Sequence, residues 1–215
     1  MSEEIKNLVD TEIDYAQLIG QQSPKNILIR NHFYFNEEIT EDSTKNLILS
    51  LNELALSIAS QALETGLEPC PIELHINSIG GDLQCALQIV QVMKDIQSGK
   101  ACQIGNTLVP IKVNTHGEGQ FCSGASLIHC VGSKRFVSKY ALSMIHPMRT
   151  LDASFKTTEE AEVALENNKM FNEIYRNIYL EHSSLTEEQL DKILKLDKFY
   201  TPEELIKMGL ADEIV

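Results

Sequence analysis

The stretch GEGQFCSGAS, residues 117–126, places one thiol and two hydroxyl groups in a glycine-rich bend. Cys122 and Ser123 are adjacent, and Ser126 follows three positions later. A serine hydroxyl becomes a competent nucleophile when a neighbouring imidazole takes its proton, and a thiol does so when its pKa is lowered. Cys122 and Ser123 are therefore the two candidate nucleophiles. Ser126 lies one helical turn further on, and we expect it to be a packing residue.

A second glycine-bearing bend, GGD at 80–82, also follows a predicted strand and opens a predicted helix. In an α/β sheet such bends lie at the carboxyl ends of their strands, where these folds place their sites, and helix N-termini there offer free N–H groups. His146 ends the apolar run SMI and is a candidate general base; His116, close to the first bend, competes with it. The histidines form no H-x-H or H-E-x-x-H motif, so no metal site is predicted.

Hydrophobic periodicity predicts the elements that must position these groups. The predicted strands are 26–36, 71–77, 109–115, a pair of short strands within 134–146, and the closing ADEIV. The predicted helices are 43–64, 83–96, 123–131, 157–182, 184–195 and 201–210. This alternation predicts an α/β sheet with right-handed crossovers. The helix at 157–182 has apolar residues but no place in such a sheet, so we expect it to project and to need a partner.

Composition limits the function classes. The 215 residues suffice for one large domain, and the net charge of −13 opposes binding to nucleic acid or to an anionic membrane. Five cysteines without a C-x-x-C pair fit a reducing compartment. With no signal-like start and no membrane-length apolar run, we expect a cytoplasmic protein. Residues 1–25 are polar and weakly patterned, and they predict an N-terminal arm ahead of a domain at 26–215.

Four segments together resemble the Clp protease proteolytic subunit (ClpP) family. INSIGGDL (76–83) is similar to that family's I-N-S-P-G-G segment, and VNTHGEGQFCS (113–123) to its V-x-T-x-x-x-G-Q-A-A-S, which ends on the nucleophilic serine. SMIHP (143–147) resembles V-M-I-H-Q-P, and DKFYTPEELIKMGLADEIV (197–215) resembles the closing R-D-R-F-x-S-x-x-E-A-x-x-x-G-L-x-D-x-I. The four occur in the family's order from about residue 30 to the C-terminus.

The resemblance implies a ClpP/crotonase-like α/β fold, a spiral sheet of βαβ units with a projecting handle helix at about 157–182. It implies a serine endopeptidase with Ser123 as nucleophile, His146 as general base and Asp197 as its orienting partner. The oxyanion donors would be the backbone N–H groups of Gly81 and Gly124. It further implies no cofactor, peptide or unfolded-protein substrates, a homo-oligomer of two stacked heptameric rings, and feeding by an AAA+ unfoldase. In such a particle, 157–182 would be protected from solvent exchange only after assembly.

The choice of nucleophile depends on the alignment. Aligning the helix on its G-A pair puts Cys122 at the nucleophile position, whereas aligning the strand and G-Q puts Ser123 there. The second alignment needs one gap, in the surface turn at 132–136, where such gaps are tolerated. We favour Ser123 and keep Cys122 as the alternative.

The chain also departs from the family pattern. Ile79 replaces a proline, Gly124 replaces a methionine, and Leu196 stands where an arginine helps to couple the rings. MRTLDASF replaces the glycine-rich run that forms a substrate-binding edge strand, and the first 30 residues do not match the axial-loop segment. Two other hypotheses therefore stay open: a catalytically inactive ring subunit, and an acyl-CoA-processing enzyme with the same sheet topology.

Overall fold

The computed structural model describes residues 26–147 and 157–215. The predicted N-terminal arm and the MRTLDASF segment lie outside the described residues. The strands are β1 (Ile27–Ile29), β2 (His32–Phe35), β3 (Ile72–Ser78), β4 (Val113–Cys122), β5 (Arg135–Val137), β6 (Leu142–Ile145), β7 (Lys198–Tyr200) and β8 (Glu213–Ile214). The helices are α3 (Glu41–Thr65), α4 (Leu83–Gln97), α5 (Gly124–Cys130), α6 (Thr158–Glu181), α7 (Glu187–Ile193) and α8 (Pro202–Lys207).

The strands form one mixed sheet in the order β1-β2-β3-β4-β5-β8, to which β6 and β7 are added through β4. The hairpin β1–β2 and the pair β6–β7 are antiparallel, and the other pairs are parallel. Strand β4 has two successive neighbours: its residues 115–117 pair with β5, and its residues 120–122 pair with β6. The predicted α/β sheet is confirmed. Its longest strand, β4, contains most of the glycine-rich segment and leads directly into α5.

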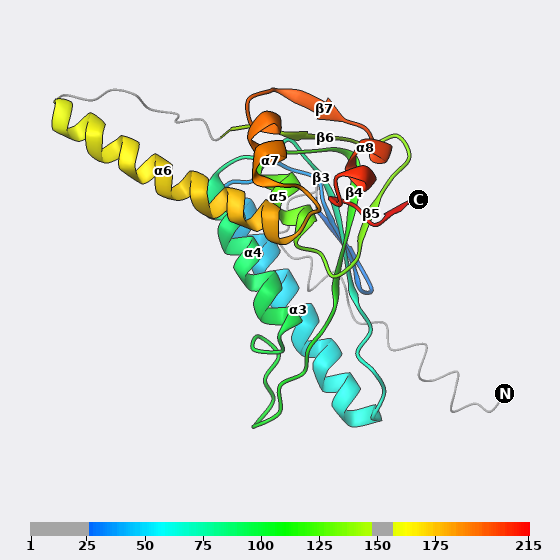
Figure 1. The fold of residues 1–215 in the computed structure, drawn as a ribbon. Coiled ribbons are helices and arrows are strands. Elements are labelled where there is room, and N and C mark those ends of the chain that lie inside the picture. Colours follow the sequence, from blue (N-terminus) through cyan, green and yellow to red (C-terminus); the bar gives the residue numbers. More distant parts are fainter. Residues whose placement is uncertain (1–25, 148–156) are drawn as a thin grey trace.

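Helices α3 and α4 pack side by side against the sheet (Figure 1). The hydroxyl of Thr40 accepts the N–H of Ser43 and the Ser43 hydroxyl accepts the N–H of Thr40, so a capping box starts α3. The carboxylate of Asp82 caps α4, and Thr201 with Glu204 forms a capping box at the start of α8. These caps fix where each helix begins. The hydrophobic core fills the space between the helices and β3 and β4.

The segment 26–36, predicted as one strand, forms the hairpin of β1 and β2, and both predicted boundaries of the strand at 109–115 were wrong. The segment from Val109 was expected to be a strand, but β4 begins at Val113, because the Ile111 N–H donates to the carbonyl oxygen of Ile96 at the end of α4. The bend was expected to open near residue 117, but β4 continues to Cys122, because its last residues pair with β6. The turn is therefore confined to Ser123.

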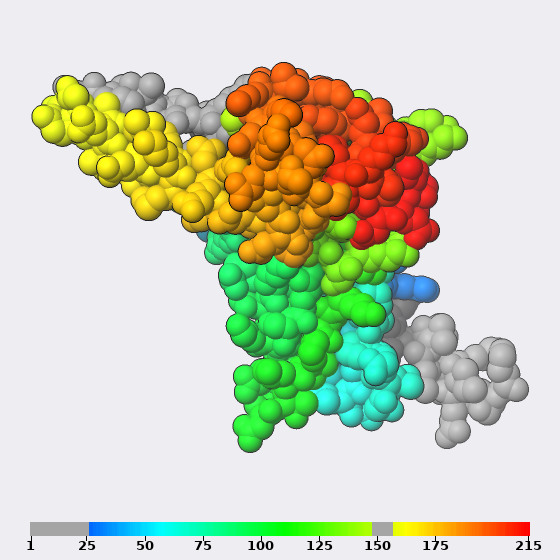
Figure 2. Space-filling model, viewed as in Figure 1, coloured from blue at the N-terminus to red at the C-terminus, as the bar shows by residue number. Residues whose placement is uncertain are grey.

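Helix α6 projects from the domain, as expected for a handle helix (Figures 1 and 2). Its two buried residues, Tyr175 and Tyr179, both lie near its C-terminal end. Its outer part exposes large apolar side chains: Val163, Leu165, Met170 and Ile174. Exposed apolar side chains along one helix mark a surface that is suited to contact with another protein. The described residues contain no helix that is long and apolar enough to cross a membrane.

Candidate functional site

Ser123 occupies a strained turn between β4 and α5. Its φ of 55° and ψ of −126° are rare for a residue other than glycine and cost on the order of 1–3 kcal/mol. The backbone holds it there: its N–H donates to the carbonyl oxygen of Met144 at 2.8 Å, and its carbonyl accepts the N–H groups of Ser126 and Leu127. The Ser123 side chain makes no capping bond to α5. A sharp turn between strand and helix therefore presents a half-buried hydroxyl that the helix does not use.

The Gly80–Gly81 bend lies against Ser123, and it can do so only because both residues lack a side chain. A Cβ on Gly80 would come within 2.7 Å of the Ser123 Cβ, and one on Gly81 would come within 2.1 Å of the carbonyl oxygen of Ile39. The φ values of 94° and 148° also favour glycine. The motif INSIGGDL is thus required by the close approach of three segments of backbone.

The bend is fixed by a single parallel bridge between Ile39 and Gly81. The Ile39 N–H donates to the carbonyl oxygen of Gly80 at 2.8 Å, and the Asp82 N–H donates to that of Ile39 at 2.9 Å. In a parallel bridge, the residue between these two bonds turns its own N–H to the opposite side. The Gly81 N–H therefore faces away from Ile39, and the Gly124 N–H, at the first position of α5, has no partner within its helix. Both are suitable donors to an oxyanion.

A cavity of about 640 Å³ brings these groups together. Its lining includes Ser123, Gly124, Gly81 and His146, the carboxylates Glu38 and Asp82, and three α6 residues, Asn168, Phe171 and Tyr175. Four of the five predicted site residues thus line one cavity at the carboxyl ends of β3, β4 and β6. A nucleophile, an imidazole and two backbone donors on one cavity can support acyl transfer at a carbonyl carbon.

Asp197, the fifth predicted residue, is not part of that lining. Strand β7 pairs with β6 so that Lys198 lies opposite Ile145, which brings Asp197 and His146 to the next position of the two strands. The Nδ1 atom of His146 lies 2.7 Å from the carbonyl oxygen of Pro147. The paired strands thus end one residue before His146 and one residue after Asp197, and the relay from Ser123 to His146 to Asp197 stays a prediction.

Cys122 and Ser126 differ from Ser123 in their surroundings. Cys122 is 4% exposed, and burial raises the pKa of its thiol, although a contact from the Gln120 amide acts in the opposite direction. A buried thiol with a raised pKa holds little of the nucleophilic thiolate. Ser126 is buried in α5, as expected of a packing residue, and its hydroxyl lies 2.8 Å from the Ser123 carbonyl oxygen and 2.5 Å from the Tyr179 hydroxyl.

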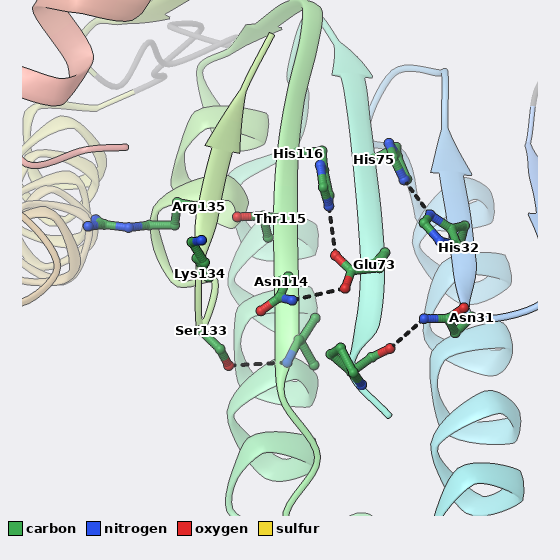
Figure 3. A network of polar contacts seen from close by, with 12 residues as sticks. Asn31, His32, Glu73, His75, Asn114, Thr115, His116, Ser133, Lys134 and Arg135 are labelled. Atoms are coloured by element: carbon green, nitrogen blue, oxygen red, sulfur yellow. Dashed lines mark hydrogen bonds and ion pairs between the residues drawn. The ribbon is translucent and has the colours of Figure 1, made fainter. Parts of the chain in front are cut away.

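His116, the competing histidine, belongs to another cluster. Its ring stacks on His75 and on Phe136 on the outer face of the sheet, and its Nε2 lies 2.7 Å from a carboxylate oxygen of Glu73 (Figure 3). Burial lowers the pKa of His116, and the bond to Glu73 opposes that shift. This position is away from the cavity that contains Ser123. Among the described residues, no group of histidine, cysteine and acidic side chains is placed to hold a metal ion.

Sequence reasoning missed Tyr175, which lines the cavity and donates a hydrogen bond to the carbonyl oxygen of His146 at 3.2 Å. It also missed Glu38 and Asp82 as acidic groups of the cavity wall. A signal for Tyr175 was present, because Tyr175 and Tyr179 are spaced by four residues and so share one helix face.

Comparisons with known proteins agree with this geometry. The family model "Clp protease" matches residues 22–215. The chain is 28% identical over 147 residues to "ATP-dependent Clp protease proteolytic subunit 1" of Streptomyces avermitilis, a match that covers 67% of this chain and 60% of that relative. It is 27% identical over 169 residues to "ATP-dependent Clp protease proteolytic subunit" of Deinococcus radiodurans, covering 76% and 75%. The first match thus spans less than two thirds of the relative's length. By the family match, which takes in the whole cavity wall described above, this chain belongs to the Clp protease family.

Proposed function

We propose that this chain is a serine endopeptidase that cleaves peptide bonds through an acyl-enzyme. The observation that carries the proposal is the cavity that Ser123, in its strained turn, shares with His146, Gly81 and Gly124. Strain of this kind persists only where the surrounding backbone enforces it, and it is typical of functional sites. The names of the two relatives, both proteolytic subunits, support the same reaction.

In the proposed reaction, the Ser123 oxygen attacks the carbonyl carbon of the scissile bond while the His146 imidazole takes the hydroxyl proton. The N–H groups of Gly81 and Gly124 stabilise the oxyanion that forms; losing one such donor typically costs about 10²–10³-fold in rate. The imidazolium then gives its proton to the departing amine, which leaves an ester on Ser123. Water hydrolyses that ester by the same steps, with His146 again acting as the base.

Asp197 is the proposed partner of His146 in this cycle. A carboxylate on the Nδ1 side of the imidazole would fix its tautomer and stabilise the imidazolium. The β6–β7 pairing supports this role, since its register, if continued one position beyond Ile145 and Lys198, would bring His146 opposite Asp197. The role requires His146 Nδ1, which lies 2.7 Å from the Pro147 carbonyl oxygen, to face the Asp197 carboxylate.

Assembly is part of the proposal. Val163, Leu165 and Met170 on the outer part of α6 are more than half exposed in the single chain and would be covered by a second copy. Two stacked heptameric rings, and an AAA+ unfoldase that supplies unfolded protein, follow from the family resemblance and from the words "ATP-dependent" in the relatives' names. Action in a reducing cytoplasm is supported by the five cysteines, which are free thiols.

A fluorophosphonate probe tests the proposal directly. The purified chain is treated with the probe and digested, and the adduct is located by mass spectrometry. We expect an adduct on Ser123 that is absent from Ser123→Ala, strongly reduced in His146→Ala and retained in Cys122→Ala. An adduct that disappears in Cys122→Ala but persists in Ser123→Ala would identify a thiol enzyme instead.

The second candidate is a catalytically inactive ring subunit. The departures of the bend from the family pattern favour it, since Ile79 stands in place of a proline and Gly124 in place of a methionine. An intact assembly that neither reacts with the probe nor cleaves a short fluorogenic peptide would support this second candidate over the peptidase.

A further inference from the structure

Two buried tyrosines of α6 are linked by hydrogen bonds to the backbone of the two proposed catalytic residues, Tyr175 directly to His146 and Tyr179 through Ser126 to Ser123. Tyr175 and Tyr179 lie one helical turn apart, and their rings meet edge to face with centroids 4.9 Å apart. They are 4% and 0% exposed, whereas the outer half of α6 is largely exposed. These two side chains are thus the buried part of the contact between the inner end of the projecting helix and the domain.

The two tyrosine hydroxyls are connected by hydrogen bonds to different proposed catalytic residues. The Tyr175 hydroxyl donates to the carbonyl oxygen of His146 at 3.2 Å. The Tyr179 hydroxyl lies 2.5 Å from the Ser126 oxygen, which lies 2.8 Å from the Ser123 carbonyl oxygen. Since a carbonyl can only accept, Ser126 donates to Ser123, and Tyr179 must then be the donor to Ser126.

Both hydroxyls keep their protons over any assay range. Burial raises the pKa of Tyr175 and that of Tyr179 above the usual value for a phenol. A buried hydroxyl without an acceptor costs free energy, so each ring is held at the position where its hydrogen bond is made. Ser123 is the residue that most needs such support, because its backbone is strained.

We propose that Tyr175 and Tyr179 are positioning residues, which hold the backbone of His146 and of Ser123, respectively, at the separation that proton transfer requires. The inference rests on the proposed peptidase function and adds to it. Tyr175 acts through the carbonyl of His146, and Tyr179 acts through Ser126. Neither hydroxyl needs to touch the substrate, although the Tyr175 ring forms part of the cavity wall.

The test removes only the hydroxyls. Tyr175→Phe and Tyr179→Phe keep the buried rings and their mutual contact, and Tyr140→Phe, at a tyrosine that is 86% exposed, is the matched control. With a short fluorogenic peptide, we expect kcat to fall about tenfold in each buried variant with KM within about twofold, since each loses one buried hydrogen bond. We expect fluorophosphonate labelling of Ser123 to slow by a similar factor, and Tyr140→Phe to behave as the unaltered chain.

Hydrogen exchange separates this inference from the proposed function, because it needs no activity. If Tyr175 and Tyr179 act as a clamp on the backbone of His146 and Ser123, amide exchange becomes faster around Ser123–Leu127 in Tyr179→Phe and around His146 in Tyr175→Phe. Exchange elsewhere stays unchanged. Faster exchange at these segments would support the clamp even if the unaltered chain neither cleaves nor reacts, a result that would count against the peptidase alone. Folded variants with unchanged kcat and unchanged local exchange would overturn the clamp itself.

Discussion

His129, a buried histidine of α5, makes the stability of this fold sensitive to mild acid. It is 2% exposed, and the centroid of its ring lies 4.7 Å from that of Phe121. Neither ring nitrogen has a hydrogen-bond partner in the described part of the chain. Burial, assisted by the nearby charge of Arg135, lowers the pKa of His129 from 6.5 to about 3. The folded chain therefore keeps this imidazole neutral while the unfolded chain protonates it. Its contribution is fully present above pH 6.5 and is lost as the pH falls toward 3.

The size of the effect follows from the two pKa values. Between 6.5 and about 3, the unfolded chain binds one more proton than the folded chain, which costs ~1.4 kcal/mol per pH unit. At about pH 5, one and a half pH units below the unfolded value, His129 therefore lowers the free energy of unfolding by about 2 kcal/mol. That is a large share of the stability of an ordinary domain.

The assay is urea denaturation of the unaltered chain and of His129→Phe at a series of pH values. Phenylalanine keeps an aromatic ring against Phe121 and removes the titration, and His129→Leu repeats the test with a different shape. The two proteins share every other titratable group, so the difference between their pH profiles isolates His129. We expect the unaltered chain to lose about 2 kcal/mol more than the variant between about pH 7.5 and pH 5. Parallel profiles over that interval would refute the argument from burial.

Three further predictions concern the site and its frame. Cys122→Ala should keep Ser123 labelling by a fluorophosphonate within about threefold, and alkylation of Cys122 by iodoacetamide should be slow, because burial raises the pKa of the thiol; fast alkylation would contradict this. Gly80→Ala should cost at least about 1–3 kcal/mol in chemical denaturation and abolish labelling, because its φ is 94° and its Cβ would meet Ser123 at 2.7 Å; normal labelling would disprove the proposed contact. Asp212→Asn should lower the free energy of unfolding at neutral pH by about 1 kcal/mol, because the Arg135 hydrogen bond holds the pKa of Asp212 below 3.8. That contribution is present above pH 3.8 and disappears as the pH falls through the lowered pKa. The free energies of unfolding of the two proteins, measured by chemical denaturation, should therefore become equal in acid.

Much of the fold could be predicted because local chemistry and periodicity agree. The 3.6-residue period of 83–96 gives α4 almost to the residue, and α3 begins at Glu41, two residues before the predicted start. The ends of β4 could not be predicted, since its last residues depend on pairing with β6, about 20 residues further along the chain, and its start follows the contact of Ile111 with Ile96 at the end of α4. Strand ends set by distant partners leave little trace in the local sequence.

The candidate site divides in the same way. The bends that contain Gly81 and Ser123 could be recognised from their glycines, because only glycine allows segments of backbone to approach this closely. The orientation of His146 could not be predicted, since its ring contacts the backbone carbonyl oxygen of the next residue. Every residue has such a carbonyl, so the sequence does not indicate which one a side chain will contact. Tyr175 was missed because a tyrosine on an amphipathic helix is ordinarily a core residue, and only the fold shows which carbonyl its hydroxyl meets.

The pairing of β5 with β8 bears on the order of folding. Its anchor, the contact between Arg135 and Asp212, joins residues 77 positions apart, and Arg135 also donates to the carbonyl oxygens of His182 and Gly209. Closing a loop of that length is entropically costly, and long-range contacts of this kind slow folding. The strands before β5 can pair through shorter loops. During synthesis, the strands and helices that carry Ser123 can therefore assemble while the β5 edge of the sheet still lacks its final strand.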